Sequence, residues 1–287
     1  MTAVDTSFSR KAKDTGAGFV GGAVQVLVGQ PFDLIKVRLQ TGQFNSPIEA
    51  FTKTLAKEGP LAFYKGTGAP LIGVGACVSV QFYAFHEARR RLLVHYNQKE
   101  LSLGQFYVAG ACAGIANTVI SSPVEQLRII LQTQRQGEFK GPIDAAKKII
   151  SNHGLFNGFY RGFWVTAARE AQAYGVWFLT FEYLMGKATE NVARQDIPTW
   201  KLMLFGGLAG EALWLSSYPL DVIKSQVQSD KFGPGRRYKG VLDAARTTMA
   251  QYGLAGFWRG IVPTLLRAIP ASASTFASVE LTLRLLG

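Results

Sequence analysis

A ten-residue pattern occurs three times in the chain, and this repeat constrains the fold more than any other feature. The copies read PFDLIKVRLQ from Pro31, PVEQLRIILQ from Pro123 and PLDVIKSQVQ from Pro219, so their starts are 92 and 96 residues apart. Each copy contains a proline, an acid two residues later, a base three residues further on and a glutamine four residues beyond the base. Repeats at nearly equal spacing indicate a fold assembled from three copies of one structural unit.

A second pattern, in which an aromatic residue precedes a base and a glycine, follows each copy of the first. A short amphipathic segment precedes it (48–57, 143–152 and 241–251) and an apolar segment follows it. Each unit therefore predicts a long helix, a loop, a short helix and a second long helix. We place the three units at 14–97, 101–188 and 199–287 of a single domain, 1–287. The base–glycine pairs are Lys65 and Gly66, Arg161 and Gly162, and Arg259 and Gly260.

The long segments have the length and composition of membrane spans. Runs 15–32, 66–85 and 101–124 carry no charge, and 164–185, 200–228 and 261–286 are apolar apart from a few charges; a bilayer span needs about 20 such residues. The mean hydropathy of +0.11 suits helices with one face on lipid and one on water. The sequence predicts an all-α membrane protein with six transmembrane helices. Small residues four apart would permit close helix packing: Gly18 and Gly22, Gly110 and Gly114, and Gly206 and Gly210.

The net charge of +12 is compatible with nucleic acid, anionic lipid or an anionic substrate. No basic cluster with stacking aromatic residues or known module is present, so we expect no nucleic-acid partner. The sequence also lacks a Cys/His metal motif, a nucleophile–base pair and a phosphate loop, so we expect neither a metal nor an enzyme. We expect Cys77 and Cys112 to be buried and reduced. The first 13 residues lack the apolar core of a signal peptide, so any organelle address is internal.

The charges after each proline must face protein or water, because each charge at a helix centre costs roughly 2.5–3.5 kcal/mol in lipid. A helix that merely ends at the membrane surface explains one such copy, but it explains three identical copies poorly. Acid and base three residues apart share a helix face, and proline kinks a helix. Three such helices around an axis predict a ring that gates a central cavity, and ion pairs near water, worth about 0–1 kcal/mol, can open again. The expected pairs are Asp33–Arg128, Glu125–Lys224 and Asp221–Lys36, with braces at Gln40, Gln132 and Gln228 and kinks at Pro31, Pro123 and Pro219.

Charges in the middle of the later helices mark a candidate binding site, because ionisable groups in membranes are usually functional. Arg169 and Glu170 precede Glu182 by 13 and 12 residues, and Arg267 precedes Glu280 by 13, so the two sites lie at similar depth. An arginine can hold a carboxylate and Glu170 can hold an ammonium, which suits a zwitterion. The alternative is an internal pair between Arg169 and Glu170.

A further acid, Glu211, lies in the fifth apolar segment, next to Gly210 and close to Trp214. It either lines the cavity and favours a cationic substrate or forms a buried pair with Arg169.

The pattern proline-x-acid-x-x-base, present three times with an aromatic-base-glycine element after each copy, resembles the mitochondrial carrier family over nearly the whole chain. The resemblance implies a three-fold pseudosymmetric bundle of six transmembrane helices with three short matrix helices, and alternating access across the mitochondrial inner membrane. It also implies a monomer with both termini in the intermembrane space, a gate on the matrix side, and cardiolipin at the three base–glycine pairs as a structural lipid, with no other cofactor. Segments such as GQPFD and YPLDVIKS are most similar to the fungal Ymc-type carriers of the carnitine, basic amino acid and glycine branch.

The family's second gate, at the cytoplasmic end of the even helices, is incomplete here. Glu87 has Arg90 at the required spacing, whereas Glu182 and Glu280 are followed by Met185 and Leu283, where bases belong. This pattern predicts a weak cytoplasmic gate. Nearby bases that could compensate are Arg89, Arg91, Lys187 and Arg284.

The resemblance also implies the class of substrate. The contact point on the second long helix falls at Val74, Gly75 and Ala76, which are small and uncharged. An arginine followed by an acid, as at Arg169 and Glu170, is the pattern of family members that carry amino acids or carnitine. We expect a carrier for a small amino acid or a related zwitterion. The alternatives are a carnitine, acylcarnitine or organic-acid exchanger and a proton-conducting uncoupler.

Overall fold

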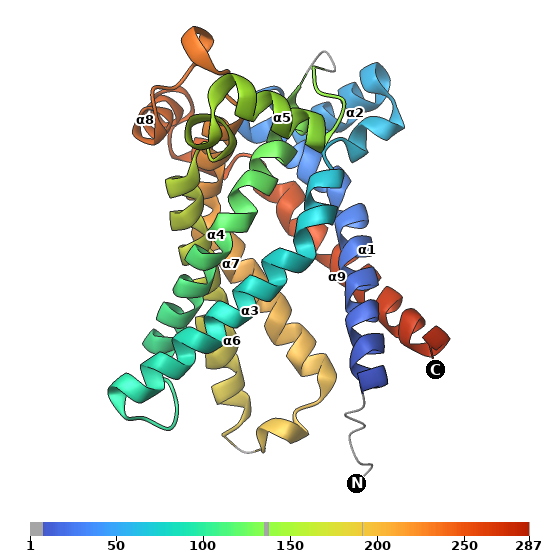
Figure 1. The fold of residues 1–287 in the computed structure, drawn as a ribbon, viewed down its shortest axis with the longest axis vertical. Coiled ribbons are helices and arrows are strands. Elements are labelled where there is room, and N and C mark those ends of the chain that lie inside the picture. The colour runs from blue at the N-terminus through green and yellow to red at the C-terminus, as the bar shows by residue number, and fades with distance from the viewer. Residues whose placement is uncertain (1–7, 135–137, 191, 287) are drawn as a thin grey trace.

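The computed structural model describes residues 8–134, 138–190 and 192–286, and these residues form helices and loops without any strand. The predicted order of long, short and long helix is confirmed in each unit (Figure 1). The short helices α2, α5 and α8 gather at one end of the molecule, and the α3–α4 and α6–α7 connections lie at the other. The long helices are α1 (Phe8–Gln40), α3 (Gly68–Tyr96), α4 (Leu103–Thr133), α6 (Phe163–Ala188), α7 (Thr199–Ser229) and α9 (Ile261–Leu286), and the short ones are α2 (Pro47–Glu58), α5 (Pro142–His153) and α8 (Val241–Tyr252).

Local sequence explains how α2 and α5 begin and how the chain enters the second long helix of each unit. Ser46 caps α2 by accepting a hydrogen bond from the Glu49 amide, and a proline opens α2 and α5, where a missing N–H is harmless. The glycine of each aromatic-base-glycine element turns the chain into the next long helix with φ of +81°, +75° and +85°. Only glycine adopts this conformation without strain, which accounts for its place in the pattern.

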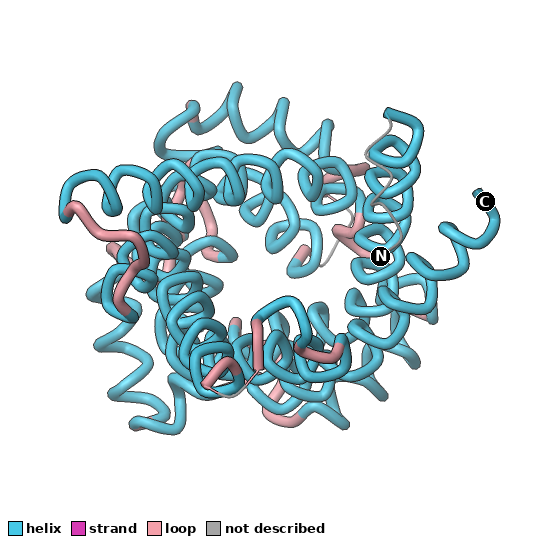
Figure 2. The backbone as a smooth tube through the Cα atoms, turned by 90° about the horizontal axis from the view of Figure 1, so that it is seen from below, coloured by secondary structure: helices cyan, strands magenta, loops and turns pink. Residues whose placement is uncertain are grey.

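The long helices surround a central axis (Figure 2) but pack unevenly. Packing is continuous from α3 through α4 and α6 to α7, and α1 packs along α9, whereas α1–α3 and α7–α9 touch little. A Cβ on Gly114 would lie 2.3 Å from the Glu170 carbonyl oxygen, so α4 and α6 approach through the predicted glycines. Among the residues that the structure describes, no neighbouring atom outside its own helix backbone lies within 4 Å of a Cβ built on Gly206 or Gly210 of α7. The expected three-fold packing is therefore interrupted in this conformation.

The molecule buries many polar and charged side chains and exposes many large apolar ones. Buried side chains include Gln30, Asp33 and Lys36, each at most 7% exposed, whereas Trp164 and Ile269 are 81% and 76% exposed. Such an inversion fits a protein whose outer surface meets lipid. The expectation of two buried thiols is wrong: Cys112 is exposed and Cys77 is half-buried.

Hydropathy alone identifies few of the long helices as membrane spans. Among the described residues only α4 meets the length and hydropathy of a span, with a mean of 1.3, and one further span results if the bent pair Pro60–Gly73 and Gly75–Tyr96 counts as one. Of the remaining long helices, α1, α6 and α7 bury charged side chains such as Lys36, Arg169 and Asp221, and α9 carries Arg267, which contacts Asp33. The repeat is therefore a stronger indication of six spans than the hydropathy is.

Candidate functional site

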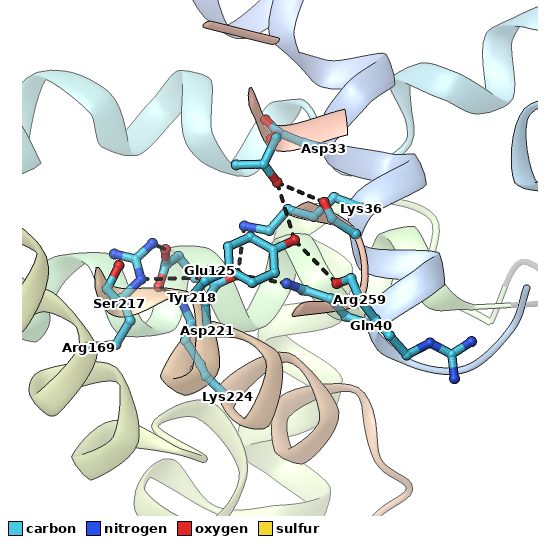
Figure 3. Close-up of polar contacts among 12 residues, drawn as sticks. Asp33, Lys36, Gln40, Glu125, Arg169, Ser217, Tyr218, Asp221, Lys224 and Arg259 are labelled. Atoms are coloured by element: carbon cyan, nitrogen blue, oxygen red, sulfur yellow. Dashed lines mark hydrogen bonds and ion pairs between the residues drawn. The ribbon is translucent and has the colours of Figure 1, made fainter. Parts of the chain in front are cut away.

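Helices α1, α4 and α7 bring the acids and bases of the repeat together in one ring. Figure 3 labels five of its members, Asp33, Lys36, Glu125, Asp221 and Lys224. The prolines lie inside α1, α4 and α7, one turn before the charged residues. Lys36 Nζ lies 2.7 Å from Asp221 Oδ2, and Arg128 Nη2 lies 2.6 Å from Asp33 Oδ2. Lys224 and Glu125 form the third ion pair. Each pair joins two different repeats, so the ring ties all three units together at one level.

The ring is better shielded from water than the sequence predicts. The side chains of Lys36 and Asp221 are 8% and 3% exposed, whereas those of Arg128 and Glu125 are 22% and 24% exposed. The estimate of about 0–1 kcal/mol applies to exposed pairs. Removing one partner of a buried pair strands the other and costs about 3–5 kcal/mol. The Lys36–Asp221 pair is therefore expected to hold most firmly.

Only one of the three glutamines braces the ring. Gln40 Nε2 donates to Asp221 Oδ2 at 2.9 Å, whereas Gln228 Nε2 donates to the Arg161 carbonyl at 3.3 Å. The side-chain amide of Gln132 has no partner among the described residues. The prediction of three braces is wrong for Gln132 and Gln228. Both pack against a glycine turn, since a Cβ on Gly66 or Gly162 would lie 3.2 Å from their Cγ atoms.

The two predicted substrate arginines reach the ring directly. Arg169 Nε lies 3.3 Å from Asp221 Oδ1, and its Nη2 lies 3.8 Å from Glu125 Oε1. Arg267 Nη1 lies 3.2 Å from Asp33 Oδ2. All three ring acids thus contact one of these arginines. Sequence spacing did not indicate these contacts, because it assigned the binding site and the gate to separate groups of residues.

The acids near these arginines differ in accessibility. Glu170 is 3% exposed and pairs with Arg169, so the internal pair is present in this conformation. Glu211 is partly exposed, and it forms no ion pair or hydrogen bond with any side chain of the described chain. The alternative pair between Glu211 and Arg169 is not formed. Gly75 and Ala76 are exposed, and the side chain of Val74 lies outside the described residues.

An aromatic residue that the sequence did not select lies among the cations. Trp214 on α7 has Lys36 Nζ 4.3 Å from its ring centroid, Arg169 Cζ at 5.5 Å and Arg267 Cζ at 5.8 Å. These distances fall within the range of cation–π attraction. The sequence contains one signal for Trp214, which is that the three repeats differ at this position. Val26 and Thr118 occupy the matching positions of the other two repeats.

At the opposite end, the acids of the second gate have local partners. Glu87 pairs with Arg90 and Arg91 of its own helix, each at 2.6 Å. Glu182 pairs at 2.8 Å with Arg194, which the sequence interpretation did not include. The side chain of Glu280 lies outside the described residues. No ion pair between repeats closes this end in the part of the chain that the structure describes.

The bases of the aromatic-base-glycine elements also contact protein groups. Lys65 pairs with Glu58, and Arg161 pairs with Asp230 at 3.4 Å. Arg259 donates to the Phe44 carbonyl at 2.9 Å. These bases therefore tie neighbouring segments of the short-helix end together.

Arg38, which has no basic counterpart in the other repeats, stands outside the ring. It donates to Glu58 at 2.6 and 3.0 Å and to Thr54 at 2.8 Å. Arg38 therefore has a local role, since it holds α2 against the end of α1.

Comparisons with known proteins agree with this architecture. The family model described as "Mitochondrial carrier protein" matches three consecutive segments, 9–96, 99–191 and 195–287. The chain is 47% identical to the mitochondrial glycine transporter YMC1 of Saccharomyces cerevisiae, over 97% of this chain and 93% of that protein. It is 42% identical to the glutamate/glycine mitochondrial carrier ymc1 of Schizosaccharomyces pombe (96% and 94%) and 38% identical to the human mitochondrial basic amino acids transporter (95% and 90%). The chain therefore belongs to the mitochondrial carrier family.

Proposed function

We propose that this multi-pass carrier of the mitochondrial inner membrane moves a small amino acid by alternating access, with its six long helices spanning the bilayer. The observation that supports this proposal best is the contact of Arg169 and Arg267 with the ring acids. A substrate carboxylate that binds these guanidinium groups competes directly with the gate. The relatives named above are carriers of glycine, glutamate and basic amino acids.

The charge balance of the centre favours a zwitterion. The network holds five cations and four acids, which leaves one positive charge, and the nearby Glu211 balances it. A zwitterion adds no net charge to this balanced set. Arginine suits the carboxylate because it forms two parallel hydrogen bonds. Glu211 suits the ammonium because it is partly exposed and unpaired with any described side chain.

Binding would then weaken the ring from within. When the substrate carboxylate binds Arg267, Asp33 keeps only Arg128 as an ion-pair partner among the described residues. When it takes Arg169, Asp221 keeps Lys36 and Gln40. Each loss lowers the free energy needed to separate α1, α4 and α7. A cavity of about 800 Å³ on the other side of the ring, lined in part by Gln226 and Tyr238, offers a route into the matrix.

We also propose cardiolipin at the short-helix end. A Cβ on Gly68 would lie 3.3 Å from Pro142 Cγ, so the N-termini of α3 and α5 adjoin. Helix N-termini favour phosphate groups. An apolar groove of about 520 Å³ beside them, lined in part by Ile72, Leu127 and Ile143, suits an acyl chain. Backbone N–H groups would hold the phosphate, since Lys65 and Arg161 already pair with acids.

Uptake of radiolabelled glycine, glutamate and lysine into proteoliposomes containing cardiolipin tests the amino-acid proposal. Saturable uptake of at least one of them is expected, and it should be lost in Arg267→Ala, which removes the only substrate arginine proposed on α9. Glu211→Gln should raise KM, because the amide cannot pair with an ammonium. Glu190→Gln serves as the matched control, since Glu190 pairs with exposed Lys187. Uptake of acylcarnitine without uptake of any amino acid would overturn the proposal.

A further inference from the structure

Three cations from three different helices gather around the indole of Trp214. Lys36 comes from α1, Arg169 from α6 and Arg267 from α9, with 4.3, 5.5 and 5.8 Å between each cation and the ring centroid. No other aromatic ring in the described ranges lies this close to more than one cation. Trp214 therefore occupies a unique position in the described chain.

These cations belong to two groups that must act together. Lys36 is part of the ring, and Arg169 and Arg267 are the proposed carboxylate ligands. Like charges this close repel one another, and the ring acids offset only part of that repulsion. The face of an indole attracts cations, and unlike a carboxylate the indole carries no net charge. Trp214 thus stabilises the three cations in one arrangement that a flexible side chain would not fix.

The position of Trp214 also breaks the symmetry of the repeat. It lies five residues before Pro219, whereas Val26 and Thr118 lie five residues before the other two prolines. Neither of these residues has an aromatic face. The three cations therefore gather around a side chain of the third repeat only. One of them is Lys36, whose pair with Asp221 is the most buried of the ring.

We propose that Trp214 is a positioning residue that couples occupancy of the substrate arginines to the closure of the ring. With the ring closed, the indole holds Lys36 against Asp221 and keeps both guanidinium groups near the ring acids. Loss of the aromatic face disperses the cations, so the substrate binds more weakly and the ring opens more often without substrate. The effect of Trp214 on substrate binding rests on the proposed amino-acid transport, whereas its effect on ring closure does not.

A graded change in the ring separates cation–π attraction from simple packing. Fluorine atoms on the indole withdraw electron density from its face while its shape changes little. Tryptophans with one to three ring fluorines are therefore incorporated into the wild type and into Trp214→Phe. Subtracting the second series removes the effect of labelling the other four tryptophans, Trp164, Trp177, Trp200 and Trp258. Trp164→Phe is the matched control, because Trp164 is 81% exposed on the outer surface.

The first measurement is glycine exchange in proteoliposomes. Cation–π contacts of this kind predict a stepwise fall in kcat/KM with each fluorine, about 5- to 30-fold over the series. Most of the fall should be in KM, and the Trp164→Phe protein should follow the wild type. A flat series with equal activity of Trp214→Phe and Trp214→Leu would overturn the coupling, because both replacements would then act only through volume.

The second measurement needs no substrate and so stands apart from the amino-acid proposal. Spin labels on the exposed residues Lys57 and Arg246 report the distance between α2 and α8, which should increase when the ring opens. Each added fluorine should raise the open fraction even if glycine, glutamate and lysine are not transported. A constant open fraction across the series would overturn the role of Trp214 while leaving the amino-acid proposal to the uptake assay.

Discussion

Replacing Asp221 by asparagine is expected to open the ring far more than replacing Lys36 by methionine, although the two residues form one ion pair. Asp221 accepts from Lys36 at 2.7 Å, from Arg169 at 3.3 Å and from Gln40 at 2.9 Å. Asparagine therefore leaves buried Lys36 without its ion-pair partner and takes one acid from Arg169, which keeps Glu170 and Glu125. Methionine at position 36 leaves Asp221 with both of its other partners. The two substitutions differ because the acid is shared and the base is not.

The magnitudes follow from burial. Stranding a buried charge costs about 3–5 kcal/mol, so Asp221→Asn should lower the closed-to-open ratio roughly 100- to 5,000-fold. Lys36→Met removes one charged hydrogen bond worth about 1.5–3 kcal/mol, which corresponds to roughly 10- to 150-fold. The double variant should resemble Asp221→Asn alone or open less, because Lys36 is then no longer stranded.

Distances between spin labels at Lys57 and Arg246 measure the closed and open populations directly, once Cys77 and Cys112 are replaced by serine. The wild type sets the reference ratio. Glu49→Gln is the control, because it changes an exposed pair with Lys53 on α2 and leaves the ring intact. Equal shifts for the two single variants, or strictly additive shifts in the double variant, would show that Asp221 is not the shared acceptor of the network.

Two further predictions concern stability. The pKa of Glu58 is lowered from its usual 4.5 to about 2, chiefly because Arg38 donates to its carboxylate. The contribution of Glu58 to stability is therefore complete above about pH 4.5 and is lost as the pH falls towards 2. Glu58→Gln should lower the free energy of unfolding by about 1–2 kcal/mol at neutral pH, a modest amount because water screens part of the pair. The variant should also lose this part of the acid sensitivity. Thermal unfolding in detergent across pH 2–7 checks both effects, and a variant as acid-sensitive as the wild type would contradict the assignment. Gly114→Ala should lower stability by about 1–3 kcal/mol through overpacking, whereas Gly210→Ala should be tolerated; equal unfolding temperatures for these two variants would refute the close contact of α4 and α6.

The repeat carried most of what the sequence could predict. Three copies of one pattern determine three copies of one helical unit, so the order of helices followed directly. The expected partners of Asp33, Glu125 and Asp221 are also present, because three copies of an acid and a base around one axis bring each acid to the base of a neighbouring unit. Symmetry was enough for these features.

Features that break the symmetry could not be predicted in the same way. Gln132 and Gln228 match Gln40 in the pattern, yet their side chains pack against glycine turns that only the folded chain brings near. Trp214 has no counterpart in the other repeats, so the pattern offered no reason to select it. The contacts of Arg169 with Asp221 and of Arg267 with Asp33 depend on how far separate helices lean inward, which spacing along one helix does not determine.

The packing of α1 along α9 has a consequence for how the protein is made. The first long helix finds its main long-helix neighbour only in the last, and the contacts of Arg267 with Asp33 and Gly29 join the two ends of the chain. Before α9 has been inserted, Asp33 therefore lacks one of its two arginine partners, because Arg267 lies 234 positions later in the chain. Because α1–α3 and α7–α9 touch little, α1 has few contacts with other long helices until α9 is in place. Because α1 packs along α9, a linker can join the original ends of the chain in a circularly permuted protein. The connection between α3 and α4 can then carry the new termini.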